Sequence, residues 1–357
     1  MVDSLNIENI AFKQFNPLTL SKEDWTMFHE YRRQRHEENS PDDPYTEDSM
    51  SEKSLESQAQ HPMFEVRAFS VIDNSTNKQI GLAMGMVFRE SSESYKGNEH
   101  LMQFDATLLS AYRRKGLGTQ ILKRILTYAQ EKDKSVLITS SHEEDGKAFL
   151  KAVGAQIAGT GAENRLILED VDWEMVTEWM KDGPKRSPGT ELKYFPSIPD
   201  DIIDEYAKVY TETLNQQPFG DLDINDIVFT PEVIREEEKR HSSLGRTRFT
   251  YLTMEADGKI SGLTEMMYRS DRKTMVSQLL TGVKQEYRGR GLGKWLKGAL
   301  LLKIKEDYPD VTIITTDNAT ENKPMISIND RLGFKVYKED ISAQIKREDL
   351  EKYLESK

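Results

Sequence analysis

The chain carries one short glycine-rich segment twice, and this duplication limits what its 357 residues can fold into. The segment reads RRKGLG at Arg113–Gly118 and RGRGLG at Arg288–Gly293. A tyrosine precedes each copy, an apolar strand-like run lies before it, and a segment with apolar residues at helical spacing follows it. Because a supersecondary unit that occurs twice in one order indicates two copies of one architecture, we expect two domains.

Other matched segments occur in the same order in both halves. They comprise a glycine–leucine pair in a strand-like run, a later β-branched run, and a glycine that closes a helix-like segment: Gly81–Met84 and Gly262–Glu265, Val136–Thr139 and Val311–Thr316, Val153–Gly154 and Leu332–Gly333. Turn-forming residues cluster between the halves. We therefore predict one domain over residues 1–170, a linker over 171–190 and a second domain over 191–357.

The composition excludes several classes of function. The chain has no cysteine, so disulfides, thiolate nucleophiles and cysteine-bound zinc are ruled out. Its histidines show no metal-ligand spacing, and we expect no metal. A formal net charge of −12 disfavours general nucleic-acid binding. No stretch reaches the ~18 apolar residues of a membrane span, and no secretory signal pattern is present. We expect a cytoplasmic protein that binds neither nucleic acid nor membrane.

The glycine-rich segments have the properties of a phosphate-binding loop. A helix N-terminus offers unpaired amide groups and a positive dipole end, and glycines let the backbone approach a phosphate closely. The P-loop motif does not fit, because Trp295 stands where that motif needs serine or threonine. The dinucleotide fingerprint does not fit either, because Lys294 stands at its third glycine. The alternative is a glycine-rich turn that only caps a helix.

At this point the chain resembles the GNAT superfamily of acyl-CoA-dependent N-acyltransferases, particularly its tandem-domain members. The resemblance is strongest over Gly262–Phe334 and weaker in the first half, where it rests chiefly on Arg113–Thr119. It implies an α+β (mixed α/β) fold in which each domain is a mixed β-sheet flanked by helices and splayed between its fourth and fifth strands. It also implies that acetyl-CoA lies in that splay.

The resemblance further implies which residues bind the coenzyme. In the second domain these are the end of a strand, the glycine-rich loop and two asparagines beyond the fifth strand: Val283, Arg288, Gly289, Arg290, Gly291, Leu292, Gly293, Lys294, Asn318 and Asn322. The first domain has matching positions: Leu108, Arg113, Arg114, Lys115, Gly116, Leu117, Gly118 and Thr119. Gly282 agrees with close backbone approach, because a glycine inside a strand often marks it; the alternative is that this glycine only relieves crowding.

The second half carries the candidate catalytic groups. Direct attack of an amine on a thioester needs a base for the amine proton, and Glu265 lies in an apolar strand whose burial would raise the pKa of a carboxyl. The alternative is a surface glutamate. Asn329 stands where many GNAT members place a tyrosine that protonates the thiolate, so we predict Tyr287 as the acid, with Tyr268, Tyr337 or water as alternatives.

The first half has lost the matching groups. Met84 matches Glu265, Glu143 matches Asn322 and Leu150 matches Asn329, so we predict a degenerate first domain. The whole chain is then expected to transfer an acetyl group from acetyl-CoA to a primary amine of a small molecule or peptide-like substrate, as a monomer or homodimer. A non-catalytic acyl-CoA sensor or scaffold, or a transferase of another acyl group, is the alternative.

Overall fold

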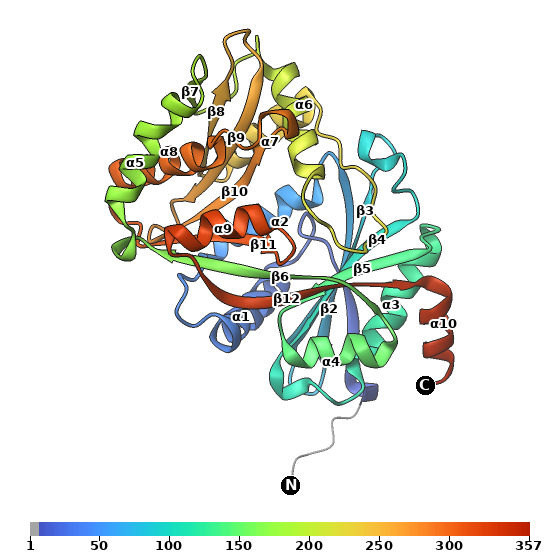
Figure 1. Cartoon of the computed structure of the whole chain (residues 1–357). Coiled ribbons are helices and arrows are strands. Elements are labelled where there is room, and N and C mark those ends of the chain that lie inside the picture. The colour runs from blue at the N-terminus through green and yellow to red at the C-terminus, as the bar shows by residue number, and fades with distance from the viewer. Residues whose placement is uncertain (1–6) are drawn as a thin grey trace. The chain divides into compact units, whose positions relative to one another are not determined.

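A computed structural model describes residues 7–357 of the chain, which divide into two compact units (Figure 1). The first unit holds the described residues up to Gly159 together with Asp221–Asn225 and Ile341–Lys357. The second unit holds Thr160–Gly220 and Asp226–Asp340. Each unit is therefore built from segments that are far apart in the sequence, and the C-terminal residues belong to the first unit.

This division differs from the predicted one, which cut the chain once near residues 171–190. Most of that stretch forms helix α5 (Trp173–Arg186), which packs in the second unit with Val176 and Trp179 buried. At Gly183 an added Cβ would lie 2.2 Å from the Trp295 ring, so α5 lies directly against a neighbouring helix. Gly183 and Pro184, which we expected to form turns in a linker, therefore lie within a packed helix.

The first unit contains a mixed sheet with the strand order β1-β2-β3-β4-β5-β12. The β4–β5 pair is parallel and the other pairs whose register is known are antiparallel. The elements are β1 (Ile10–Phe15), α1 (Lys22–Asn39), α2 (Asp48–Ala59), β2 (Phe64–Asp73), β3 (Lys78–Phe88), β4 (Leu101–Leu108), α3 (Leu117–Glu131), β5 (Val136–Ser141), α4 (Glu144–Val153), and from the C-terminus β12 (Lys335–Lys346) and α10 (Arg347–Glu355).

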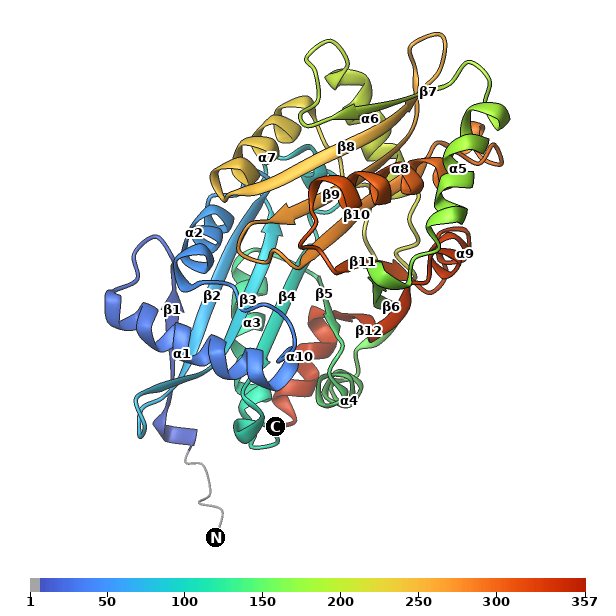
Figure 2. The same ribbon diagram turned by 90° about the vertical axis from the view of Figure 1, so that its left-hand side faces the viewer.

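Helices cover both faces of this first sheet (Figure 2). Helices α1 and α2 pack on one face over a small core that includes Phe15, Phe28 and Tyr31. Helices α3, α4 and α10 pack on the other face over the larger core, to which α3 contributes an apolar stripe at helical spacing, as an amphipathic helix does. Ile345 and Leu350 show that the C-terminal segment completes this larger core.

The second unit repeats the arrangement with the strand order β6-β11-β10-β9-β8-β7. The β10–β11 pair is parallel and the other pairs are antiparallel. Besides α5, its elements are β6 (Gln156–Ile167), β7 (Glu191–Phe195), α6 (Ile203–Asn215), α7 (Pro231–Ser243), β8 (Arg246–Met254), β9 (Ile260–Arg269), β10 (Met275–Val283), α8 (Leu292–Asp307), β11 (Ile313–Ala319) and α9 (Lys323–Leu332). The order of elements follows that of the first unit, as the repeat predicts.

Each face of the second sheet again has its own helices and core. Helices α6 and α7 cover one face, where Tyr206, Leu252 and Leu263 are buried together. Helices α5 and α8 cover the other face, where Met266 and Leu300 are buried. Side chains alternate between the faces along β9, as they must in a strand. The face that a β9 residue occupies therefore decides which helices it can contact.

Both sheets open between their fourth and fifth strands. Strand β10 pairs with β11 through Met275–Ser277, although β10 continues to Val283. In the first unit β4 pairs with β5 through Leu101–Gln103, although β4 continues to Leu108. In β10 the register with β9 also shifts between Gln278 and Thr281, at the start of the opening. The predicted splay is confirmed in both units.

No helix within the described part of the chain is both long enough and apolar enough to cross a membrane.

Candidate functional site

The two glycine-rich segments form the same turn. Gly291 is the N-cap of α8 with φ +85°, and Gly116 is the N-cap of α3 with φ +82°. Two residues earlier the backbone is again left-handed, at Gly289 with φ +80° and at Arg114 with φ +60°. A left-handed turn followed at once by the first helical turn presents amide groups that have no carbonyl partner within the helix. The predicted cradle geometry is therefore present at both helix N-termini.

Three cations gather around the loop of the second unit. Arg186 of α5 donates to the carbonyl oxygen of Gly289 at 3.1 Å, and its guanidinium lies 3.2–3.3 Å from where a Cβ of Gly291 would stand. Burial, together with the charges of Arg331 and Arg186, lowers the pKa of Lys294. Among residues 7–357, none of the three has a carboxylate partner. This phosphate cluster, Arg186, Lys294 and Arg331, is suited to an anionic ligand.

The loop arginines predicted to bind the coenzyme have other partners. Arg288 donates to the carbonyl oxygen of Val283 at 3.2 Å and also to Gln216, so it ties the end of β10 to the loop. Arg290 forms an ion pair with Glu255 at 3.1 Å and lies over the Tyr287 ring. These contacts fix both side chains beside the loop, and the phosphate cluster adds further positive charge there.

In the first unit, two arginines beside the matching loop are paired with a glutamate. Glu143 accepts from Arg35 at 2.6 Å and pairs with Arg113 at 2.5 Å. Both arginines also donate to the carbonyl oxygen of Leu108, at 3.5 Å from Arg35 and 3.1 Å from Arg113. Burial alone would raise the pKa of Glu143, but the hydrogen bond and charge of Arg35 and the charge of Arg113 lower it. The glutamate at the position of Asn322 thus occupies the arginines beside the splay.

Glu265, the predicted base, is fully buried on the face of β9 that carries α6. Arg248 donates to both of its oxygens, at 2.9 and 2.7 Å, while the Tyr206 hydroxyl and Thr250 donate to one of them. Burial alone would lower the pKa of Arg248, but the charge of Glu265 raises it well above its usual range. The carboxylate is therefore bound in an internal ion pair, and its role as a base stays a prediction.

A second buried polar group lies on the opposite face of the same sheet. Lys297 of α8 donates through Nζ to Gln278 Oε1 of β10 at 3.0 Å and to Asn329 Oδ1 of α9 at 2.5 Å. Asn329 in turn donates to Asn318 of β11 at 2.7 Å. The lysine is 1% exposed, and burial lowers its pKa to about 7. These four residues, the splay cluster, join both strands of the opening.

The other predicted site residues take varied positions. Asn318 belongs to the splay cluster, whereas Asn322 is the N-cap of α9 without a capping hydrogen bond from its side chain. Tyr287 is partly buried beside the loop. At Gly282 an added Cβ would lie 2.4 Å from Thr213 of α6, so the crowding alternative accounts for this glycine.

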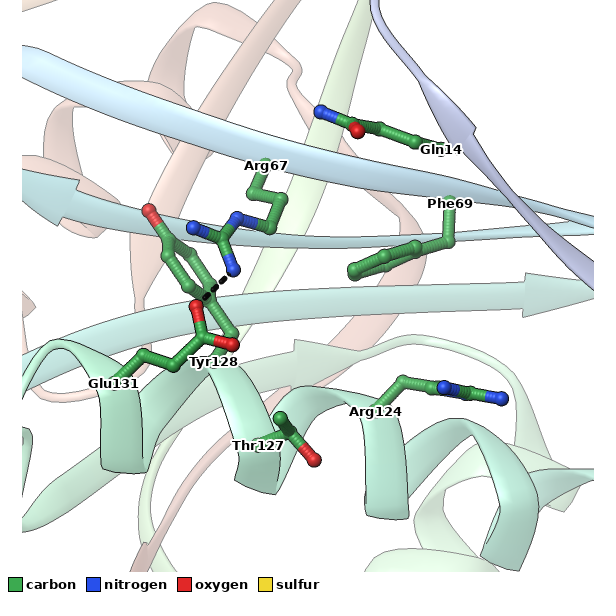
Figure 3. Close-up of a pocket in the computed structure, with 7 residues that line it drawn as sticks. All are labelled: Gln14, Arg67, Phe69, Arg124, Thr127, Tyr128 and Glu131. Atoms are coloured by element: carbon green, nitrogen blue, oxygen red, sulfur yellow. Dashed lines mark hydrogen bonds and ion pairs between the residues drawn. The ribbon is translucent and has the colours of Figure 1, made fainter.

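A pocket of the first unit lies outside these sites (Figure 3). It is lined by residues of β1, β2 and the second half of α3, and not by the loop at the start of that helix: Gln14, Arg67, Phe69, Arg124, Thr127, Tyr128 and Glu131. Arg67 pairs with Glu131 and lies over the Tyr128 ring at 4.2 Å. Two of its charged side chains therefore neutralise each other.

Comparison with known proteins agrees with this geometry. Residues 25–155 match the model of the Acetyltransferase (GNAT) family. Over 95% of this chain and 98% of the other, the structure is similar to a tandem GNAT protein from the clavulanic acid biosynthesis pathway, with a TM-score of 0.74 at 19% identity. The chain therefore has a fold similar to that of a tandem GNAT protein. The family match covers the first half, although the motifs quoted for the resemblance are more specific in the second.

Two further solved structures are similar to this chain in fold. A GCN5-related N-acetyltransferase from Sphaerobacter thermophilus has a TM-score of 0.62 at 12% identity, covering 95% of this chain and 96% of that one. An N-myristoyltransferase from Saccharomyces cerevisiae with bound myristoyl-CoA has a TM-score of 0.55 at 10% identity, covering 95% and 83%. No curated protein matches the chain in sequence.

Three residues of the candidate site were not predicted from the sequence. Arg186 and Arg331 lie far from the loop in sequence, and no local pattern places them there. Lys297 left a signal, because Leu301 and Ile304 follow it at helical spacing and are buried. A lysine on the apolar stripe of a helix departs from the amphipathic pattern. Comparison with Leu122, at the matching position of the first half, reveals this departure.

Proposed function

We propose that the chain is an acetyl-CoA-dependent N-acetyltransferase whose catalytic site is the splay of the second unit. The acceptor is a primary amine of a small molecule or of a peptide-like substrate. The observation that supports this best is the contrast between the two loops. The second unit has three cations without carboxylate partners at its loop, whereas Glu143 occupies the arginines beside the loop of the first unit.

The residues present suit a coenzyme A derivative. Diphosphate oxygens would accept hydrogen bonds from the amides at the start of α8 and from the phosphate cluster. The unpaired edge of β10 beyond Ser277 offers main-chain groups to an extended amide-containing arm. The reaction would form a bond between the acceptor nitrogen and the acyl carbon as the carbon–sulfur bond breaks. With a free-thiol pKa of about 8.5, the thiolate is a tolerable leaving group.

Acetyl transfer to an amine can be tested on the full chain. Calorimetry with acetyl-CoA is expected to find one strong site, and release of free CoA thiol is expected with some member of a panel of primary amines. Myristoyl-CoA and acetyl-CoA should be compared as donors in the same assay. Binding without release of thiol on any amine would support the sensor alternative, and two equal sites would contradict the proposed difference between the units.

An Arg186→Met variant tests whether acetyl-CoA binds to the second unit. We expect the dissociation constant for acetyl-CoA to rise about tenfold or more, because a charge-assisted hydrogen bond contributes about 1.5–3 kcal/mol. Arg67→Met is the matched control, since it removes an arginine from the pocket of the first unit. Equal affinities of both variants and of the unmodified protein would contradict the role of the phosphate cluster.

A further inference from the structure

The splay cluster has polar side chains at positions where the first unit has apolar ones. Lys297 and Leu122 occupy the same position, five residues after the first residue of α8 and of α3. Asn329 and Leu150 likewise stand four residues before the glycine that ends α9 and α4. The first unit therefore builds the same packing with two leucines, and its leucines are buried too.

Burying the lysine does not serve stability. Taking an ammonium group out of water costs several kcal/mol unless it is paired, and the groups that face Lys297 are neutral. They are the amides of Gln278 and Asn329 and, at 5.5 Å, the ring of Phe334. The first unit shows that an apolar side chain is sufficient at this position. A polar side chain that the fold does not require is often found at a functional site.

The position of the cluster relates it to the opening of the sheet. Gln278 directly follows Ser277, the last β10 residue that pairs with β11. Asn318 lies on β11, beyond the end of the same pairing. The cluster therefore spans the two strands where they part, and Lys297 reaches it from the α8 side of the sheet. Glu265 lies on the opposite face, toward α6, so the two buried polar groups approach the splay from different sides.

The protonation of Lys297 suits proton transfer. Burial lowers the pKa of this amine to about 7, so both its forms are populated near neutral pH. The ammonium has three N–H donors, of which Gln278 and Asn329 take two. Within the described part of the chain, no hydrogen bond uses the third donor.

We propose that Lys297 is the proton donor to the thiolate that leaves during acyl transfer in the second unit. This proposal rests on the proposed function. The acceptor nitrogen bonds to the acyl carbon, the carbon–sulfur bond breaks, and its electron pair goes to sulfur. A proton moves from the Lys297 ammonium to that sulfur, and the proton released by the acceptor nitrogen restores the ammonium. Gln278 and Asn329 are positioning residues that hold Nζ between the strands.

The titration of bound coenzyme A tests this proposal without an acceptor. The ultraviolet absorbance of the thiolate reports its formation as the pH rises, for the full chain saturated with CoA. Lys297, with a pKa of about 7, and the thiol would titrate as a coupled pair in which the ammonium and the thiolate stabilise each other. We therefore expect part of the thiolate to form about one pH unit or more lower in the unmodified protein than in Lys297→Met. Lys303→Met makes the same change elsewhere on α8, at a residue paired with Asp307, and should titrate like the unmodified protein.

A second variant keeps the test informative if Lys297→Met folds poorly. The double change Lys297→Leu with Asn329→Leu installs the leucine pair of the first unit, and we expect it to fold at least as stably as the unmodified protein. Its turnover should fall on the order of 10²-fold, the usual effect of removing a general acid. In the unmodified protein, turnover should decline above about pH 7 as the ammonium is lost, a decline absent from the double variant.

The outcomes separate this proposal from the proposed function. If CoA binds but its thiol titrates identically with and without Lys297, the lysine is not near the sulfur and this inference alone is overturned. Unchanged turnover and pH profile in the double variant would overturn it equally. If the unmodified protein binds no CoA by calorimetry, the proposed function falls, and the inference falls with it.

Discussion

At the scale of single residues, each unit contains a glutamate that forms ion pairs with arginine. The two glutamates differ in burial, and substituting them is expected to affect stability differently. Glu265 is fully buried with Arg248, whereas Glu143 is partly exposed between Arg35 and Arg113. A charge without access to water depends on its partner far more than an exposed one does. Substitution at Glu265 is therefore first a test of stability, and only then a test of catalysis.

We expect Glu265→Gln to lower the free energy of unfolding by about 3–5 kcal/mol, because it leaves the Arg248 charge buried without its partner. Replacing both residues, as Arg248→Met with Glu265→Leu, should recover most of the loss. Urea unfolding of the single and double variants measures both effects. The same double variant tests the predicted base, since turnover that survives in a stable protein without this carboxylate would remove Glu265 from the mechanism.

The ion pairs of Glu143 with Arg35 and Arg113, here called the Glu143 bridge, predict that the free energy of unfolding depends on pH. The folded pKa of this carboxyl is below its ordinary value of 4.5. Its contribution is therefore fully present above pH 4.5 and is lost as the pH falls through the folded pKa. Urea midpoints of the unmodified protein and Glu143→Gln should differ by a constant amount near neutral pH and converge as the pH falls through the folded pKa. A difference that persists undiminished in acid would contradict the bridge.

At the scale of elements, the repeated strand, loop and helix set the geometry of both candidate sites. The loop residues with positive φ and the following helices agree between the units, so the backbone of a phosphate cradle is present twice. The units differ in what surrounds that backbone. Arg186 and Arg331 come to one loop from α5 and from the end of α9, whereas α4 begins at Glu143 beside the other.

Matched valine substitutions at the two N-caps should distinguish the two loops by their effect on acetyl-CoA affinity. A β-branched residue is strained at φ +85° in Gly291→Val and at φ +82° in Gly116→Val, so both variants should lose a similar amount of stability. Only Gly291→Val should also lose acetyl-CoA affinity, because its Cβ would lie 3.2 Å from the Arg186 guanidinium. Calorimetry decides the point, and equal affinities in the two variants would contradict a site confined to the second unit.

At the scale of the whole molecule, the chain does not divide at a single point. Strand β12 pairs with β5 of the first unit through Ile341–Lys346, although these residues are close to the C-terminus. Strand β6, which follows the first copy of the repeat, pairs with β11 of the second unit through Gly161–Ile167. Each copy of the repeat therefore receives a strand from beyond its own half of the sequence.

This exchange predicts how fragments behave. Residues 1–170 expressed alone lack β12 and α10, which would leave one edge of β5 unpaired and expose the core around Leu137, so we expect aggregation. Residues 1–159 joined by a flexible linker to residues 341–357 should be soluble and unfold cooperatively. Circular dichroism and gel filtration compare the two fragments. A cooperative transition in the fragment that lacks residues 341–357 would contradict the exchange.

Much of the fold is determined locally and can be predicted from the sequence. The glycine-rich loops lie at the predicted helix starts, because hydrophobic periodicity and glycine backbone preferences act over a few residues. Partners that are distant in sequence leave no such local signal. The phosphate cluster, the Glu143 bridge, the Arg248–Glu265 pair and the exchange of β6 and β12 exist only once the chain is packed. The sequence by itself thus determined two copies of a glycine-rich turn at the start of a helix, while tertiary packing decided which cations surround each copy and where a buried lysine meets the opening between the strands.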